Sequence, residues 1–373
     1  MDKLKRTGIA RLPLHYGKAP RWLVARMIEL ADAIVTIIID EYGQDEFLQR
    51  ISDPFWFQAL GCVLGYDWHS SGVTTVLTGV LKNAVKPEKH GVAVCGGKGK
   101  TSLKTPGEIR LTGEIFGFSK SDIDRLVYSS KMSAKVDNTA IQAGYSLYHH
   151  VFFVSKNGKW AVVQQGMSIV DRTARRYHWL SEHVKEFVAE PHDAIVGDTK
   201  RKTVLNMTAR ESEECRKTCV DIVKEKPRKV KQLLKSARPA YQKSLQEWMS
   251  KAKVENYTFT LLSMPRRINW NALRKAYEFQ PKNYEELLGI KGVGSATVRG
   301  LALVSEIIYG QPPSWKDPVK FSFAYGGKDG VPRPVDRKAM DKSVQILKEV
   351  IQNAKINNKT KLKSLKRLKN IFV

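Results

Sequence analysis

The sequence predicts an α+β protein of 373 residues. A mixed α/β domain containing a β-hairpin is expected over residues 1–200, and an all-helical domain over residues 201–373. Three observations predict this arrangement. Two strand-forming runs flank a turn at Asn157 and Gly158, helical spacing dominates after residue 208, and two helical segments meet at a glycine-containing turn within residues 284–309. A chain of this length can bury more than one core.

The first domain is expected to begin with helices. An arm rich in Pro and Gly covers residues 1–21. The apolar run over residues 22–42 is interrupted by charged residues, so it predicts a buried amphipathic helix and no membrane span. Asp53 followed by Pro54 predicts the start of a second helix, because Asp caps helices and Pro is tolerated in the first turn. Polar groups, among them Asp67 and His69, then crowd between two apolar stretches.

A glycine–lysine loop covers residues 95–102. It lacks the Walker spacing, and residues 103–106 are not expected to begin a helix, so the sequence argues against a nucleotide-hydrolysing enzyme. Two interpretations of Lys98 and Lys100 stay open. They contact a phosphate, or they belong to a flexible turn.

The predicted hairpin carries polar pairs at one end. His149 and His150 precede its first strand, and Gln164 and Gln165 end its second. In an antiparallel pair these ends meet, so the two polar pairs are expected to be neighbours. They are either solvated hairpin ends or the lining of a catalytic site, which the upstream residues Lys135 and Asp137 could join.

Helices are expected over residues 168–189 and 208–226. Cys215 and Cys219 would share one face of the second helix. Two buried thiols are expected there, and half a metal site is the alternative. The cysteine usage and the absence of a signal peptide predict a cytoplasmic protein.

The turn within residues 284–309 is the most informative feature. Gly292 and Gly294 can adopt backbone angles closed to other residues and expose N–H groups at the start of a helix, where the helix dipole favours an anion. Lys291 adds a positive charge. The pattern predicts a helix–hairpin–helix that contacts a nucleic-acid backbone, and an ordinary helix connection is the alternative. The candidate contact residues are Lys291, Gly292, Val293, Gly294, Ser295 and Thr297.

The charge agrees with a nucleic-acid partner. The chain has 63 Lys and Arg against 37 Asp and Glu, a net charge of +26, and its field attracts polyanions. Residues 224–253 contain ten basic and two acidic residues, and the C-terminal tail, residues 351–373, contains seven basic residues and no acid.

The residues after this turn resemble the helix–hairpin–helix superfamily of DNA glycosylases. A Gly/Pro-rich loop leads to Asp336, and in those enzymes such an Asp stabilises charge on the sugar or helps to activate the nucleophile. The family's lysine, two residues after the second glycine, is Ala296 here, and Asp336 lies 42 residues beyond Gly294, about double the family's spacing. The intervening insert offers Lys320 and Lys328 as alternative nucleophiles. Asp336 is alternatively a helix cap alone.

Most of the chain is similar to an archaeal and thermophile family catalogued as domain of unknown function 763. The resemblance implies a lineage and a fold but no activity. It rests on residues 6–20 (RTGIARLPLHYGKAP), 53–61 (DPFWFQALG), 67–71 (DWHSS), 96–101 (GGKGKT), 147–150 (LYHH) and 163–167 (VQQGM).

Two functions are expected from these features. The first is a DNA-processing enzyme, a repair nuclease or a glycosylase/AP lyase, with its polar clusters in the first domain; a nuclease would need Mg²⁺ or Mn²⁺. The second is a non-catalytic nucleic-acid-binding protein whose polar clusters are structural. DNA is the expected partner and RNA the alternative, no membrane is expected, and the oligomeric state is left open.

Overall fold

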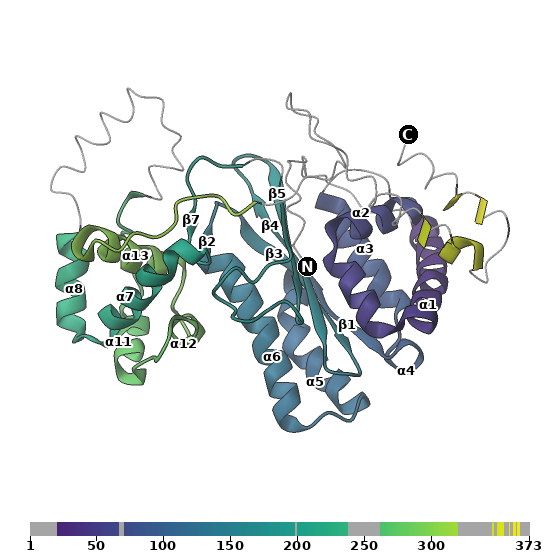
Figure 1. The fold of residues 1–373 in the computed structure, drawn as a ribbon, viewed down its shortest axis with the longest axis horizontal. Helices are drawn as coiled ribbons and strands as arrows, with labels where there is room; N and C mark the ends of the chain where they lie inside the picture. The colour runs from purple at the N-terminus through teal and green to yellow at the C-terminus, as the bar shows by residue number, and fades with distance from the viewer. Residues whose placement is uncertain are drawn as a thin grey trace.

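The computed structural model describes residues 21–66, 71–197, 200–237 and 262–319, and short pieces between residues 345 and 365. At its centre is a five-stranded antiparallel sheet with helices on both faces (Figure 1). The strands lie in the order β1–β3–β4–β5–β6. Their bounds are β1 (Val92–Lys98), β3 (Ser146–Ser155), β4 (Trp160–Ser168), β5 (Thr173–Leu180) and β6 (Ala194–Gly197).

The first helices of the chain cover one face of the sheet. They are α1 (Arg21–Ser52), α2 (Pro54–Val63) and α3 (Ser71–Ala84), and the short α4 (Pro87–His90) leads into β1. The expected helix over residues 22–42 is confirmed, and α1 continues past a break at Gly43, where φ is +83°. The expected helix start at Asp53 is also confirmed. Its carboxylate accepts hydrogen bonds from the N–H groups of Phe55 at 2.7 Å and Trp56 at 3.3 Å.

The other face is covered by the helices that come after β1. These are η1 (Gly99–Lys104), α5 (Thr105–Ile115), α6 (Lys120–Lys135) and η2 (Val136–Ala140), which is one turn of π-helix. Further along the chain come η3 (Arg210–Ser212), α7 (Glu213–Lys224), α8 (Pro227–Ser236), α11 (Trp270–Phe279), α12 (Tyr284–Gly289) and α13 (Ser295–Tyr309). A small sheet of β2 (Ile141–Gln142) and β7 (Leu205–Asn206) lies beside α13 (Figure 1).

Both faces of the sheet are buried, which explains why its strands are continuous apolar runs in the sequence. Phe153 and Val163 pack against α1–α3, whereas Phe152 and Val162 pack on the opposite face. On that face one hydrophobic cluster extends from the strands to α7, α12 and α13. The predicted boundary near residue 200 therefore falls between segments that share this core.

The predicted hairpin is confirmed. Val154 pairs with Trp160 across a turn in which Gly158 has φ +76°. The cysteines Cys215 and Cys219 are both buried in α7, as expected.

The helix expected over residues 168–189 is wrong. That segment contains β5, whose polar residues obscured the strand pattern. Arg175 on β5 is completely buried and forms an ion pair of 2.8 Å with Asp317, which is also buried. Because such a residue is paired inside the protein, its polarity does not mark an exposed face. The expectation that no helix begins at residues 103–106 is also wrong, since α5 begins at Thr105.

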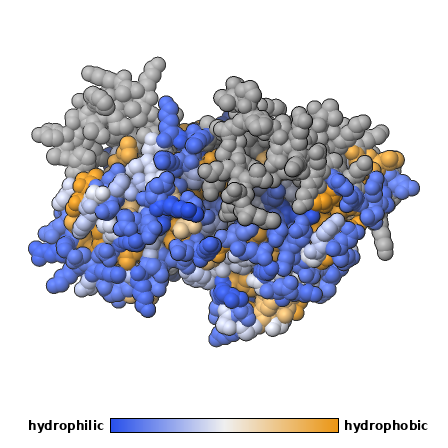
Figure 2. Space-filling model, in the orientation of Figure 1, coloured by the Kyte–Doolittle hydropathy of each residue, from blue (hydrophilic) through white to orange (hydrophobic). Residues whose placement is uncertain are grey.

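Most of the surface drawn in Figure 2 is hydrophilic, and hydrophobic residues occupy small separate areas. Among the residues that the structure describes, no helix is both long and apolar enough to cross a membrane.

Candidate nucleic-acid interface

Residues 290–294 form the turn between α12 and α13. Gly292 has φ +99°, a conformation that L side chains rarely adopt, and a Cβ atom there would lie 2.8 Å from Asn269 Nδ2. The same Asn269 nitrogen donates a hydrogen bond of 3.2 Å to the Gly292 carbonyl. Gly294 has φ −122° and open space beside it, and Val293 between the two glycines is completely buried. The turn therefore requires a glycine at position 292, and position 294 keeps the helix start uncovered.

Two more side chains hold the turn from the side of the sheet. Lys135, the last residue of α6, donates a hydrogen bond to the carbonyl of Val293. Gln142 in β2 donates one of 2.8 Å to the carbonyl of Ser295. Burial lowers the pKa of Lys135. Lys135, which the sequence suggested for the polar cluster, thus contacts the turn, and the carbonyl groups of the turn are bound from within the protein.

The N-terminus of α13 differs from that of α12. Gly294 is the N-cap of α13; no side chain caps this end, and its first turn has no acidic residue. In α12 the side chain of Asn283 caps the helix, and Glu285 and Glu286 lie in the first turn. The N–H groups and the positive dipole end of α13 therefore suit an anion. In α12 the cap and the two acidic side chains already take that place.

Exposed basic side chains belong to the segments around this turn. Lys291 is exposed within it, and Arg266 and Arg267 are exposed just before the asparagine that binds the Gly292 carbonyl. Trp270, at the start of α11, is 43% exposed, and Lys231 Nζ lies 5.7 Å from the centre of its ring. Arginine, lysine and aromatic side chains are the groups that contact phosphates and stack on bases.

One main-chain N–H group of the glycine–lysine loop already has a partner within the protein. The N–H of Gly96 donates a hydrogen bond of 2.7 Å to the Glu108 carboxylate, which also pairs with Lys82 at 2.6 Å. A phosphate could not take this N–H without displacing a like-charged carboxylate. Lys98 and Lys100, however, are exposed beyond it, and Lys98 Nζ lies 5.8 Å from the ring of Tyr148.

The polar pairs of the hairpin are cross-strand neighbours, as expected. His149 pairs with Gln165, and His150 with Gln164. They do not form one site, because successive residues of a strand point to opposite faces of the sheet. We name the two groups the His149 cluster, on the α1–α3 face, and the His150 cluster, on the α6 face.

The His150 cluster is a chain of hydrogen bonds that ends on Asp137. His150 bonds through Nε2 to Ser130 Oγ at 2.9 Å and through Nδ1 to Gln164 Oε1 at 2.8 Å. Gln164 Nε2 donates to Asp137, a completely buried residue of η2. Asp137 also accepts a 3.0 Å hydrogen bond from the indole of Trp179 and contacts His192 Nε2. The carboxylate is thus surrounded by donors, which compensates for its burial.

The His149 cluster joins β3 and β4 to α3. His149 Nε2 lies 2.9 Å from Thr78 Oγ1, and Thr74 Oγ1 lies 2.5 Å from Gln165 Oε1. Arg176 of β5 stacks on Phe57 at 4.6 Å, on the same face.

Burial determines the charge state of both histidines. It lowers the pKa of His149 to about 3, with a further contribution from the charges of His150 and Lys98, and it also lowers the pKa of His150. Both side chains are at most 7% exposed. At neutral pH they are uncharged hydrogen-bonding groups inside the protein, which is the environment of residues that hold a fold together.

The other catalytic candidates lie outside the described residues; they are Asp67, His69, Lys320, Lys328 and Asp336. Within the part of the chain that the structure describes, no group of three or more His, Cys, Asp and Glu side chains could hold a metal ion. Gln142 and Asn269 were not candidates from the sequence, because their contacts with the turn connect residues far apart in the chain.

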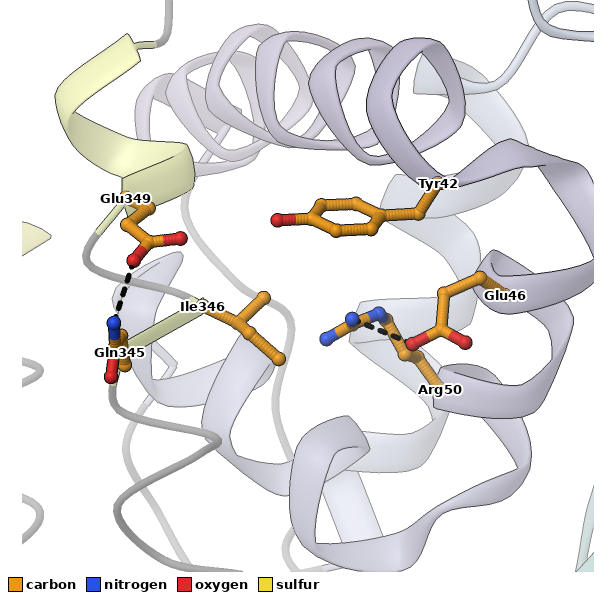
Figure 3. A pocket seen from close by; sticks show the side chains of 6 residues that line it. All are labelled: Tyr42, Glu46, Arg50, Gln345, Ile346 and Glu349. Atoms are coloured by element: carbon orange, nitrogen blue, oxygen red, sulfur yellow. Dashed lines mark hydrogen bonds and ion pairs between the residues drawn. The ribbon is translucent and has the colours of Figure 1, made fainter.

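A pocket of about 400 Å³ lies apart from both clusters, between α1 and the C-terminal pieces (Figure 3). Its charged groups pair with their own neighbours. Arg50 bonds to Glu46 at 2.7 Å and lies 5.5 Å from the ring of Tyr42, and Gln345 bonds to Glu349 at 2.9 Å.

Comparisons with known proteins gave one match. A family model described as "Protein of unknown function (DUF763)" matches residues 8–335. That range includes the sheet, the helices on both of its faces and the turn between α12 and α13. A search of curated proteins and a search of solved structures gave no match.

Proposed function

We propose that this chain, which belongs to the DUF763 family, binds DNA by its phosphate backbone through the turn between α12 and α13. The observation that carries the proposal is the uncapped, acid-free N-terminus of α13 beside the exposed Lys291. A phosphate there would accept hydrogen bonds from main-chain N–H groups and contact a cation. Such contacts position a duplex and do not depend on its base sequence.

The whole-chain charge supports a polyanionic ligand. A net charge of +26 brings DNA to the surface by long-range attraction, and the exposed Arg266 and Arg267 add cations near the turn. Duplex DNA is the proposed ligand because a rigid turn fixed by Lys135, Gln142 and Asn269 suits the regular spacing of its phosphates. RNA is the alternative ligand and is compared directly in the test.

A repair nuclease or glycosylase/AP lyase is the first function that the sequence predicts, and it stays a prediction. The described residues favour binding over catalysis, since the His149 and His150 clusters are enclosed and hydrogen-bonded. The candidates in residues 67–69 and 320–336 await a direct assay.

The test is fluorescence anisotropy with labelled duplex DNA, single-stranded DNA and duplex RNA across a range of salt concentrations. We expect tight duplex binding. The logarithm of the association constant should fall linearly with the logarithm of the salt concentration, with a slope of about −0.9 for each phosphate neutralised. Binding that is weak or insensitive to salt would contradict the proposal.

The same mixtures should be run on denaturing gels with EDTA, Mg²⁺ or Mn²⁺, using intact, abasic and damaged duplexes. Binding that persists in EDTA without strand cleavage supports the binding function alone. Metal-dependent cleavage of intact strands would add a nuclease. Cleavage at abasic or damaged sites, trapped by borohydride, would add a lyase and direct attention to Asp336, Lys320 and Lys328.

A further inference from the structure

The loop between β4 and β5 presents two adjacent hydrophobic side chains to solvent. Ile169 is 78% exposed and Val170 is 93% exposed, which makes Val170 the most exposed large hydrophobic residue that the structure describes. Single exposed aliphatic residues are common on protein surfaces, but a hairpin end with two in a row offers an apolar surface to a partner.

This hairpin end has a defined conformation. Ser168 Oγ donates a hydrogen bond of 2.5 Å to Asp171 Oδ2, and the Asp171 N–H donates one of 3.3 Å back to Ser168 Oγ. Arg201 pairs with the same carboxylate from a neighbouring loop. At the start of β5 the Thr173 hydroxyl lies 3.2 Å from the Tyr145 hydroxyl. Ile169 and Val170 are thus held outward on a fixed support, which lowers the entropy lost when they bind a partner.

Basic residues are common in the segments at this end of the sheet. The pairing of the strands places the end of β1, the end of β4 and the start of β5 at the same end of the sheet. The described basic residues of these segments and of the loop that holds Arg201 are Lys98, Lys100, Lys104, Arg172, Lys200, Arg201 and Lys202. The described acid among them, Asp171, is paired with Arg201. A matching partner has anionic groups outside and flat apolar surfaces within, as stacked base pairs do.

One short segment of the chain connects the base of this loop with the proposed phosphate site. Gln142 bonds to the first residue of α13, and Tyr145, three residues later, contacts Thr173 at the start of β5. The backbone between these two residues spans at most about 10 Å. A duplex bound at α13 would be long enough to reach the β4–β5 loop as well.

We infer that Ile169 and Val170 form a wedge that enters between adjacent base pairs of the bound DNA and unstacks them, while the basic residues at this end of the sheet hold the flanking phosphates. The inference rests on the proposed function and deepens it, because it implies a ligand that is bent or locally opened. Apolar side chains that enter base steps in this way exchange stacking energy for additional contact with the deformed duplex.

The test uses a set of short duplexes, each with one 2-aminopurine at a different central position, because its fluorescence rises when the base unstacks. The double variant Ile169→Ser/Val170→Ser removes the wedge. The matched control is Leu111→Ser/Ile115→Ser on α5, two other exposed hydrophobic residues at 62% and 52% exposure. All four side chains are exposed, so both variants should fold, which circular dichroism and a thermal melt will check.

At saturating protein we expect the unmodified chain and the α5 control to raise the fluorescence at one or more positions. The wedge variant should lose this rise and bind about tenfold more weakly, because the burial of aliphatic surface that offsets the cost of unstacking is lost. Its salt dependence should be unchanged, because the phosphate contacts remain.

Three results would overturn the wedge, and together they distinguish its failure from that of the proposed function. If the unmodified chain saturates the duplex without any rise in fluorescence, backbone binding stands and the wedge fails. If the chain does not bind duplexes at all, the proposed function fails with it. If the wedge variant loses binding to phosphatidylserine vesicles but behaves like the unmodified chain on DNA, the loop contacts an anionic membrane surface instead.

Discussion

Gln142 Nε2 donates a hydrogen bond of 2.8 Å to the carbonyl of Ser295, the first residue of α13. The same amide nitrogen also donates to the carbonyl of Thr139 at 3.1 Å in η2. One side chain therefore connects the π-helical turn beside the sheet to the helix start that we propose binds phosphate. This contact joins the packing of α13 in the core and the Lys135–Val293 contact in holding the helix relative to the sheet.

Replacing Gln142 by Ala should lower both stability and DNA affinity. The two hydrogen bonds that Nε2 donates are lost, and so is the longer one of 3.5 Å that Arg299 donates to Oε1. The free energy of unfolding should fall by about 1–3 kcal/mol, and duplex affinity should fall because the start of α13 is less well fixed. Urea unfolding and anisotropy measure the two effects. The control is Asn83→Ala, an exposed amide that bonds to the Gly79 carbonyl within α3. Equal losses in both variants would show that the effect is not specific to Gln142.

The two glycines of the turn should respond differently to substitution. Gly292→Ala introduces a Cβ at φ +99°, 2.8 Å from Asn269 Nδ2, so it should destabilise the turn by about 1–2 kcal/mol and weaken binding to all sequences alike. Gly294→Ala has room and an ordinary φ, so it should lower the melting temperature less than Gly292→Ala does, even though Ala is a poorer N-cap than Gly. A Gly292→Ala variant with altered sequence preference and intact affinity would disprove the phosphate contact.

Lys291→Gln should reduce the salt dependence of binding. Removing one phosphate contact lowers the log–log slope by about one and weakens binding to different sequences by the same factor. Lys217→Gln on α7 is the control, because Lys217 is exposed and pairs with Glu213 and Glu214 of its own helix. An unchanged slope for Lys291→Gln would place the DNA elsewhere on the protein.

Asp137→Asn tests whether the His150 cluster is structural. Asn has nearly the same size as Asp, but its NH₂ group would face N–H donors such as those of Trp179 and Gln164 at a completely buried position. We therefore expect a loss of about 2–4 kcal/mol in the free energy of unfolding. Duplex affinity at a temperature where the variant is folded should be unchanged. A variant of normal stability that had lost a DNA-cleaving activity would instead identify Asp137 as a catalytic residue.

Acid should destabilise the protein through its buried histidines. The pKa of His149 is lowered to about 3, and burial also lowers the pKa values of His150 and His178. Each folded-state pKa lies below the unfolded value near 6.5, so the unfolded chain binds more protons below that pH. Stability is therefore complete above pH 6.5 and is lost as the pH falls towards 3.

Urea unfolding at pH 7.5 and 5.5 measures this loss. Three histidines, each contributing up to about 1.4 kcal/mol per pH unit below 6.5, should lower the free energy of unfolding by about 3 kcal/mol over this interval. His149→Gln, which can keep the contact with Thr78, should reduce the loss by roughly a third. Stability that rose on acidification would contradict the assignment of neutral buried histidines.

Local signals were sufficient to predict several elements. The helix start at Asp53 and the hairpin turn at Gly158 depend on neighbouring residues, so the sequence contains their cause. The strand β5 was mistaken for a helix because Arg175 finds its partner Asp317 at a separation of 142 residues, which no local pattern reveals.

The candidate site was predictable to a similar extent. Antiparallel pairing predicted that His149 and Gln165 are neighbours, and this is confirmed. The separation of His149 from His150 was also available from the sequence, since adjacent residues of a strand point to opposite faces. The contact between Lys135 and Val293 was not available, because it depends on how α6 packs against the distant turn.

The π-helical turn η2 lies between α6 and β2, and it has one residue more per turn than an α-helix would have there. Lys135, just before it, reaches out to the turn, and Asp137, inside it, reaches inward to the strands. Deleting one residue here would rotate α6 by about 100° relative to β2, the next element of the chain. The number of residues in this segment therefore determines whether Lys135 can point to the turn while Asp137 points to the strands. A one-residue deletion would misplace both side chains at once, so it should be more damaging than most substitutions of either residue.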